Sequence, residues 1–572
     1  MTTLSCIPFA VGHRDEGVCL GLELGRHRVL LDCGLADITP LLLGAPWDAV
    51  VCSHAHADHA RGLLALRRHC PTLPIYSSQP TATALPLNWP DRTDPSTTVA
   101  EGIPWRTPVS VGKPNDVSSE AEPEGKTREP AELSVELWPA GHLPGAAATL
   151  LTYRTPTKTY QVLHLGDCFL SAMRLVEGLP LMALRGLEPD VLIVDGTYGT
   201  QRYPHRRRQE NDLTARLRHV LDVGVRSRIV FPVPTLGLGQ ELLMLLRSHY
   251  HTAGYPVTIW VDPIVATGCD AYLAMPEALS QPVQNFAQHQ AIFWDERVFP
   301  HVRRLPDPTT LAAALAQDEP AIFIVHPATL PSTYCQDTTA EWTLFLSETG
   351  NLATWQTEHS PAEAYDWLDA IKNATASGTV QLETYLLTDH CDGASTTQLI
   401  HNLRPRHVIL HQGDPAGLAA LADVETLQTR YKLHIPTPNH TLSLPLDTQF
   451  WRHPQPITLP PSPTYEGEVS FRPPAAEIAV TLPADVAADP RWQAFAETGL
   501  ITAQWQGNQL ILQGVSPDQL LNVPPQDPER PACVNCRALQ GQTCRQPASP
   551  LFNRIVAPEA VCREFQPFAA EA

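Results

Sequence analysis

Four side chains able to bind a metal ion occur within the ten residues 53–62. These side chains are His54, His56, Asp58 and His59. They follow the apolar run Ala49–Cys52, which predicts a buried strand, so the ligands lie on the turn leaving its carboxyl end. Histidines two residues apart on such a turn can converge on one ion, while the next acid and histidine can face a second. Imidazole suits zinc, and an added carboxylate favours a hydrolytic dinuclear site over a closed structural one.

Two ions need more ligands than this turn supplies, and three other strand ends offer them. The candidates are Asp32, His142 and Asp167. Each comes at or just after an apolar run that predicts a strand. An acid beside a glycine is often only a turn residue, but the order of these residues before and after the histidine cluster favours a metal site. We therefore expect them at the same rim of the sheet.

The series acid, H-x-H-x-D-H, histidine, acid resembles the motifs of the metallo-β-lactamase superfamily. The resemblance implies an α/β fold, an αββα sandwich, with two Zn²⁺ ions at its active site. The implied ligands are His54, His56 and His142 for one ion, and Asp58 and His59 for the other. By the same resemblance Asp167 bridges the two ions, and Asp32 orients the ligands through hydrogen bonds.

Further segments resemble the motifs of the β-CASP branch of this superfamily, the nucleases of RNA and DNA processing. Asp195–Gly199 is similar to the acid-x-Thr-Tyr-Gly motif, and Tyr385–Asp392 contains the D-H-x-D pattern. A third strand ends at His411, and Phe231–Leu243 resembles the strand-to-helix entry of the inserted β-CASP domain. The resemblance extends over roughly residues 1–450.

The β-CASP motifs imply a reaction. His390, steered by Asp195, would give a proton to the leaving oxygen of a scissile phosphate. His411 would complete the ligands of the second zinc, and in this family a histidine there accompanies RNA substrates, whereas the DNA-repair group usually has valine. A two-metal site activates water near neutral pH and stabilises the charge of the transition state. We therefore expect a zinc-dependent ribonuclease acting on single-stranded RNA, with endonuclease and 5′ exonuclease modes both open.

Three other functions remain open. One is a DNA exonuclease of the same superfamily, which His411 disfavours. Another is a small-molecule hydrolase of thioesters or lactones, which would need neither Asp195 nor His390. The last is a non-catalytic subunit of an RNA-processing complex, which the complete ligand set disfavours.

The chain is acidic, with 60 acidic and 40 basic residues and a net charge of −20. This balance excludes a broad basic channel for nucleic acid and predicts weak, salt-sensitive binding. One local basic run follows the first β-CASP motif and is predicted to contact phosphates without reading sequence. Its members are Arg202, Arg206, Arg207 and Arg208.

The thirteen cysteines are mostly spread among apolar segments, a usage typical of reduced core residues. The first residues lack a basic flank and a signal-type apolar run, and no apolar run reaches the ~18 residues of a membrane span. We therefore expect a cytoplasmic protein that neither is secreted nor contacts a membrane. A homodimer and membership of an RNA-processing complex both remain open.

Proline-rich and polar segments predict the domain boundaries. The predicted parts are residues 1–199, the first part of the sandwich; 200–378, the inserted domain; 379–450, the second part of the sandwich; 451–474, a proline-rich linker; 475–525, a small α+β accessory module with a helix near Arg491 and a hairpin at 501–512; and 530–572, a cysteine-containing tail. Within the first part, 102–132 is predicted to be a surface loop.

The tail carries its own metal signal. It contains Cys533, Cys536, Cys544 and Cys562. Because a segment below ~40 residues rarely builds a sufficient core, a metal ion is a physical way to stabilise it. A third, structural Zn²⁺ is the preferred interpretation, with an iron–sulfur cluster, free thiols or a disulfide as alternatives.

Overall fold

The computed structural model divides the chain into two units, Met1–His453 and Pro454–Ala572, which are described separately. It describes residues 2–13, 16–91, 98–112, 132–223, 227–253, 257–295, 297, 301–305, 308–315, 319–329, 334, 341–348 and 380–447 of the first unit, and 468–472, 477–481, 501–506, 509–514, 536–540 and 543–549 of the second.

The first unit contains a seven-stranded sheet in the order β20-β1-β2-β3-β4-β5-β6. Its strands are β1 (Thr3–Val11), β2 (Val18–Leu24), β3 (His27–Leu31), β4 (Ala49–Val51), β5 (Ile75–Ser78), β6 (Glu101–Ile103) and β20 (Leu442–Pro445). Strands β20, β1, β2 and β3 are antiparallel neighbours, and β3 to β6 are parallel. The parallel half places the carboxyl ends of β3 and β4 at one rim.

A second seven-stranded sheet has the order β19-β18-β11-β10-β9-β8-β7. Its strands are β7 (Val109–Val111), β8 (Glu132–Pro139), β9 (Ala147–Arg154), β10 (Thr159–His164), β11 (Val191–Asp195), β18 (His407–His411) and β19 (Lys432–His434). Strands β10, β11, β18 and β19 are parallel, with Asp195 paired to His411 at the ends of β11 and β18. This register brings two predicted site residues to one rim.

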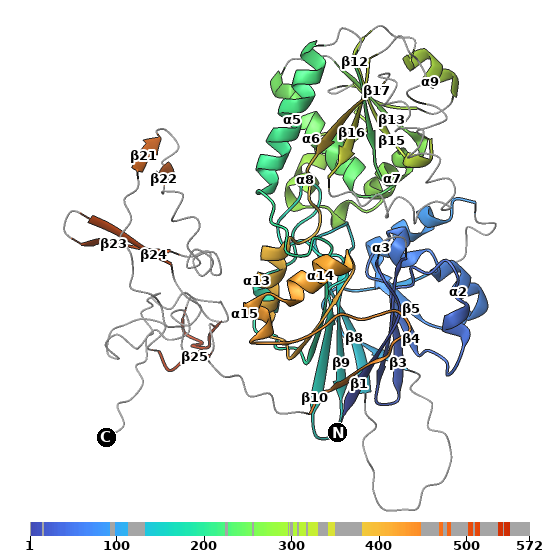
Figure 1. Cartoon of the computed structure of the whole chain (residues 1–572), viewed down its shortest axis with the longest axis vertical. Coiled ribbons are helices and arrows are strands. Elements are labelled where there is room, and N and C mark those ends of the chain that lie inside the picture. Colours follow the sequence, from blue (N-terminus) through green and yellow to red (C-terminus); the bar gives the residue numbers. More distant parts are fainter. Residues whose placement is uncertain are drawn as a thin grey trace, which may run out of the picture. The chain divides into compact units, whose positions relative to one another are not determined.

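The two sheets share one buried apolar core, to which Leu22 and Leu31 of the first sheet and Val135 and Ile193 of the second belong. Figure 1 shows the sheets face to face, with α2 and α3 outside the first and α13, α14 and α15 outside the second. The sandwich helices are α1 (Ala57–Ala60), α2 (Leu63–His69), α3 (Gln79–Ala84), α4 (Leu181–Leu184), α13 (Gly393–Leu403), α14 (Pro415–Ala422) and α15 (Glu425–Gln428). The predicted αββα sandwich is confirmed.

The inserted domain has a six-stranded, all-parallel sheet in the order β14-β13-β15-β12-β16-β17. Its strands are β12 (Ser227–Pro232), β13 (Thr258–Val261), β14 (Val302–Arg304), β15 (Ala321–Val325), β16 (Glu341–Ser347) and β17 (Val380–Tyr385). Its helices are α5 (Arg206–Val223), α6 (Leu238–Ala253), α7 (Pro263–Leu273), α8 (Gln281–Ala287) and α9 (Pro308–Leu315). The fully buried runs of β12 and β15 fit a sheet covered on both faces (Figure 1).

Two boundaries differ from the sequence prediction. Strand β17 pairs with β16 of the inserted sheet, so the chain returns to the sandwich after Tyr385 rather than at residue 379. Strands β6 and β7 lie within or at the edge of the predicted loop 102–132, because each pairs with a neighbouring strand of the sandwich; residues 113–131 lie outside the described part.

In the second unit the structure describes three hairpins. They are formed by β21 (Glu468–Arg472) with β22 (Glu477–Thr481), β23 (Ile501–Gln506) with β24 (Gln509–Gly514), and β25 (Leu539–Gln540) with β26 (Thr543–Cys544). The second is the hairpin predicted at 501–512, and β21 is a strand where a linker is predicted. The helix predicted near Arg491 and most of 451–474 lie outside the described residues. Among the described helices, none has the length and apolarity to cross a membrane.

Candidate active site

Four of the predicted ligands meet at the rim of the sandwich. Their ligand atoms, one from each of His54, His56, His142 and Asp167, all lie within 4.8 Å of one another. The Nδ1 atom of His56 lies 3.1 Å from Nε2 of His54 and 3.2 Å from Nε2 of His142. The Oδ2 atom of Asp167 lies 3.5 Å from His54 Nε2 and 3.8 Å from His142 Nε2. Three imidazoles and one carboxylate thus surround a space of the size that a zinc ion requires.

Two of these histidines are oriented by main-chain carbonyls from distant segments. Nε2 of His56 lies 3.3 Å from the carbonyl oxygen of Leu236 in the inserted domain, and Nδ1 of His142 lies 3.0 Å from that of Asp389. Because a carbonyl oxygen can only accept, the ring nitrogen facing it carries the hydrogen. The other nitrogen of each ring then presents its lone pair to the cluster, as a metal ligand must.

A second group of ligand atoms adjoins the first through Asp167. Nε2 of His59 lies 3.3 Å from Asp167 Oδ1 and 3.7 Å from Asp58 Oδ2. His59 Nε2, Asp167 Oδ1 and both ring nitrogens of His411 are buried without a hydrogen-bond partner. Buried polar atoms normally have partners, so these fit the ligands of an ion. Among the described residues, however, Asp58, His59 and His411 belong to none of the three groups whose ligand atoms lie within 4.8 Å of one another.

Asp32 anchors the turn that carries the histidines. Its carboxylate accepts hydrogen bonds from the Ser53 amide at 2.6 Å and the Ser53 hydroxyl at 2.9 Å, and its Oδ2 lies 2.8 Å from Nδ1 of His59. The Ser53 oxygen also lies 3.1 Å from Nδ1 of His54. Ser53 was not singled out from the sequence, although a small hydroxyl residue directly before the histidine cluster was the available signal.

The protonation of the cluster suits metal binding. Burial is the main cause that holds the pKa of His54 well below its usual value, that of His142 at about 4 and that of His411 at about 3. These three rings are therefore neutral at pH 7. Burial opposes the charge of His59 as well, but the carboxylates of Asp167, Asp58 and Asp32 outweigh it and raise its pKa well above the usual value. These carboxylates thus favour a protonated His59, which would have to lose the proton at Nε2 to bind a metal ion.

His390 lies beside the same cluster of ligand atoms. Its Nδ1 donates to Oδ2 of Asp195 at 2.6 Å, so the short aspartate side chain is long enough to reach the ring. Its Nε2 lies 3.8 Å from Oδ2 of Asp167 and 3.9 Å from Oδ1 of Asp389. Burial opposes protonation of His390, but these three carboxylates raise its pKa well above the usual value. The ring therefore holds a proton beside the candidate metal ligands.

The segment that carries His390 is held by the first turn of α5. The Gln209 side chain accepts from the Thr388 amide at 2.8 Å, and its Nε2 donates to the Thr388 hydroxyl at 3.0 Å. The Tyr198 hydroxyl donates to Oδ1 of Asp389 at 3.1 Å. These contacts hold the loop that carries Asp389 and His390. Gln209 was not identified from the sequence, whereas Tyr198 lies in the Asp195–Gly199 motif.

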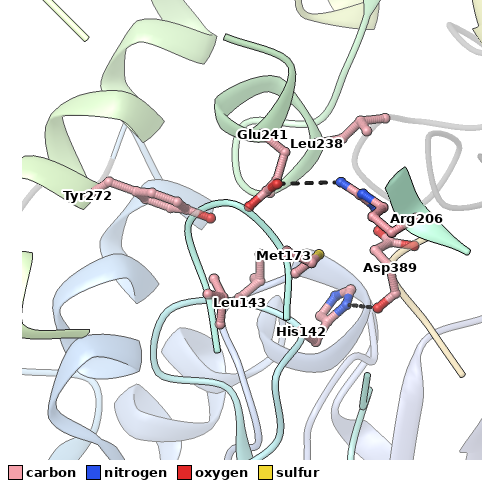
Figure 2. A pocket seen from close by; sticks show the side chains of 10 residues that line it. His142, Leu143, Met173, Arg206, Leu238, Glu241, Tyr272 and Asp389 are labelled. Carbon is pink, nitrogen blue, oxygen red and sulfur yellow. Dashed lines mark hydrogen bonds and ion pairs between the residues drawn. The ribbon is translucent and has the colours of Figure 1, made fainter. Parts of the chain in front are cut away.

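The structure places Arg206 differently from the other predicted RNA-binding arginines. Its guanidinium donates to the Thr388 carbonyl and pairs with Glu241 at 3.4 Å, with 9% of the Arg206 side chain and 4% of the Glu241 side chain exposed (Figure 2). It therefore ties the inserted domain to the loop of His390 instead of presenting a free charge. The remaining three, Arg202, Arg207 and Arg208, are exposed.

Replacement of Arg206 by alanine is expected to lower the free energy of unfolding by about 3 kcal/mol, because it leaves the buried Glu241 carboxylate without its cationic partner. Chemical denaturation followed by circular dichroism measures this loss. The matched exposed variant Arg207→Ala should stay within about 0.5 kcal/mol of the wild type. Equal effects of the two substitutions would contradict a structural role for Arg206.

Two of the four tail cysteines lie in the described part of the chain. Cys536 and Cys544 are buried, and Leu539, three residues after Cys536, pairs with Cys544 in the β25–β26 hairpin. Cys533 and Cys562 lie outside the described residues. The third metal site therefore stays a prediction.

Comparisons with known proteins agree with this geometry. Residues 27–230 match the model of the beta-lactamase superfamily domain. An uncharacterized protein of Synechocystis sp. is 41% identical over 99% of this chain and 97% of its own length. The transcription termination factor FttA of Methanococcus maripaludis is 25% identical over 55% of this chain and 50% of its own, and the probable RNase MJ4 of Methanocaldococcus jannaschii is 27% identical over 40% and 54%.

The chain thus spans about half the length of these archaeal relatives. The matched superfamily domain contains the segments with His54, His142 and Asp167 and ends within β12, the first strand of the inserted sheet in the chain, while the other strands of that sheet and the His390 segment follow it. Sandwich, insertion and clustered ligands together place this chain in the metallo-β-lactamase superfamily, as a member of its β-CASP branch.

Proposed function

We propose that this protein is a zinc-dependent ribonuclease that hydrolyses phosphodiester bonds of single-stranded RNA. The observation that carries the proposal is the contact of His390 with Asp195, at 2.6 Å, beside the ligand cluster. A proton donor held there suits a substrate whose leaving oxygen must be protonated. The names of two archaeal relatives, a probable RNase and a transcription termination factor, point to RNA as well.

The first group of ligand atoms fits one zinc ion, and the unpartnered buried atoms of His59 and His411 support a second. His54, His56 and His142 would hold one ion, His59, Asp58 and His411 the other, and Asp167 would bridge them, which gives partners to the buried atoms that lack them. Bound zinc would supply positive charge for the phosphate and lower the pKa of water. Asp32 would keep the ligands in place through Ser53 and His59.

In the proposed reaction a water oxygen forms the new bond to phosphorus and releases a proton to solvent, while the bond to the leaving oxygen breaks and its electron pair stays on that oxygen. Nε2 of His390 gives its proton to that oxygen. The Asp195 carboxylate, fixed by the Thr197 amide at 2.7 Å and hydroxyl at 2.5 Å, stabilises the charged ring before the transfer. Exposed Arg202, Arg207 and Arg208 would contact phosphates weakly outside the cleft.

One assay separates the candidate functions. Zinc-loaded protein is incubated with a 5′-labelled single-stranded RNA, a DNA of the same sequence and a small thioester. Cleavage of RNA above the other two supports the proposal, and the product ladder distinguishes endonuclease from 5′ exonuclease. Preference for DNA would indicate a DNA exonuclease instead, and preference for the thioester would indicate a small-molecule hydrolase. No hydrolysis of any of the three would favour a non-catalytic subunit of an RNA-processing complex.

Elemental analysis of the purified chain is expected to find three zinc ions, two in the sandwich and one at the tail cysteines. Cys536→Ser should remove only the tail ion, and Cys70→Ser, at a cysteine outside both sites, should remove none. A single ion or none in the sandwich would rule out the two-metal site. Iron with inorganic sulfide would replace the tail zinc by a cluster.

A further inference from the structure

A carboxylate that the proposed reaction does not use lies next to the proton donor. Oδ1 of Asp389 is 3.9 Å from Nε2 of His390, and 33% of the Asp389 side chain is exposed. It borders a small pocket that is also lined by His142, Arg206 and Glu241 (Figure 2). Because the two side chains are this close and Asp389 is partly exposed, a substrate atom that contacts Nε2 of His390 also lies near the Asp389 carboxylate.

The neighbours of Asp389 occupy few of the hydrogen-bond acceptor sites on its carboxylate. Its main-chain oxygen faces Nδ1 of His142, and the Tyr198 hydroxyl donates one hydrogen bond to Oδ1. An ionised carboxylate offers about four acceptor sites. At least one acceptor site toward the pocket thus remains for a donor from the substrate.

The chemistry of RNA limits what that donor can be. Phosphodiester and ring oxygens only accept, so the 2′-hydroxyl is the one hydrogen-bond donor of an internal ribose–phosphate backbone. If the leaving atom is the 3′-oxygen, the 2′-hydroxyl is on the adjacent carbon, at about hydrogen-bond separation from it. A 3′-oxygen that accepts a proton from His390 Nε2 then brings its 2′-hydroxyl within reach of an acceptor at the position of Asp389 Oδ1.

We propose that Asp389 accepts a hydrogen bond from the 2′-hydroxyl of the nucleotide whose 3′-oxygen leaves, and so makes the site selective for RNA over DNA. This inference rests on the proposed ribonuclease function and specifies its substrate. DNA lacks the donor, so with DNA the carboxylate lies beside the backbone with no partner and repels the phosphate. The contact belongs to the reacting nucleotide, so selectivity requires no broad basic surface.

The test combines one substrate change with one side-chain change. After the cleavage site in a labelled RNA is mapped, a second RNA is made with a single 2′-deoxy nucleotide on the 5′ side of that bond. Wild-type protein should cleave this bond roughly 10- to 100-fold more slowly, the range of a hydrogen bond to a charged group. Asp389→Ala should be slower on the all-ribose strand by a similar factor, with little further loss from the deoxy substitution.

Four controls define the result. A 2′-deoxy nucleotide on the 3′ side of the bond, and the exposed variant Asp423→Ala, should each leave the rate near that of the wild type. Asp389→Asn, whose amide oxygen still accepts, should recover part of the discrimination. The zinc content of Asp389→Ala should equal that of the wild type.

Equal deoxy effects in wild type and Asp389→Ala would overturn the inference while the ribonuclease proposal stands. Loss of zinc from Asp389→Ala would overturn it in favour of a metal ligand, since Asp389, His142 and His390 also form one of the ligand-atom groups. Faster cleavage of both strands by Asp389→Ala would overturn it as well, because it would show that the Asp389 carboxylate only repels the phosphate. No cleavage of RNA by the wild type contradicts both proposals.

Discussion

Asp167→Ala is expected to reduce RNA hydrolysis to the background rate and to remove at least one zinc ion from the sandwich. The reason is its position between both groups of ligand atoms: Oδ2 lies 3.5 Å from His54 Nε2, and Oδ1 lies 3.3 Å from His59 Nε2. Without this carboxylate the two groups share no ligand, and the charge that a phosphate requires is lost. Single-turnover cleavage and elemental analysis of the same preparation measure both losses.

The control for this prediction must separate chemistry from folding. Thermal unfolding of Asp167→Ala followed by circular dichroism should still show one cooperative transition, and Asp423→Ala should keep full activity. His59→Ala should reproduce the loss, because it removes a ligand of the second group only. Near-normal turnover of either active-site variant at saturating zinc would contradict the ligand assignment.

His390→Ala is expected to retain both zinc ions and RNA affinity, yet to slow cleavage by roughly 10²- to 10⁴-fold, the usual contribution of general acid catalysis. His390 Nδ1 donates to Asp195 at 2.6 Å, and its Nε2 lies 3.8 Å from Oδ2 of Asp167, so in the proposed reaction the ring delivers a proton and holds no ion. Asp195→Asn should slow the reaction in the same direction, because a neutral amide stabilises the charged ring less.

The leaving atom supplies the decisive comparison for His390. A thiolate needs no proton, so an RNA with sulfur in place of the leaving oxygen should lose much less rate in His390→Ala than the ordinary RNA does. Equal losses on both substrates would eliminate the general-acid role. Undiminished RNA cleavage by the variant would instead overturn the assignment of Tyr385–Asp392 as a catalytic β-CASP motif.

The positions of the site residues could be predicted because local patterns mark the ends of strands. Asp32 follows β3, the His54 turn follows β4, Asp195 ends β11 and His411 ends β18, and parallel strands bring such ends to one rim. A short apolar run followed by a ligand is visible in one sequence. The fold then brings the ends of these distant strands, and the ligands on them, close together.

The supporting contacts could not be predicted in the same way. The carbonyl of Leu236, which orients His56, leaves no mark in the sequence, because every residue has a carbonyl. Arg206 looked like part of a basic run, but helical periodicity turns it toward Glu241 while Arg207 faces outward. The acid four residues after it, Glu210, was the available signal, since their side chains lie 3.6 Å apart.

The carbonyl contacts of the two histidines also set the order in which the centre can form during synthesis. His56 and Leu236 are separated by 180 positions, and His142 and Asp389 by 247. A ribosome adds roughly 5–20 residues per second, so the early ligands emerge many seconds before the groups that orient them. Until His411 has been made, a nascent chain holds only part of its ligands, unoriented and exposed to any metal ion in the surrounding solution. Under the proposed ligand assignment, the complete set of ligands therefore exists only after His411 has been made.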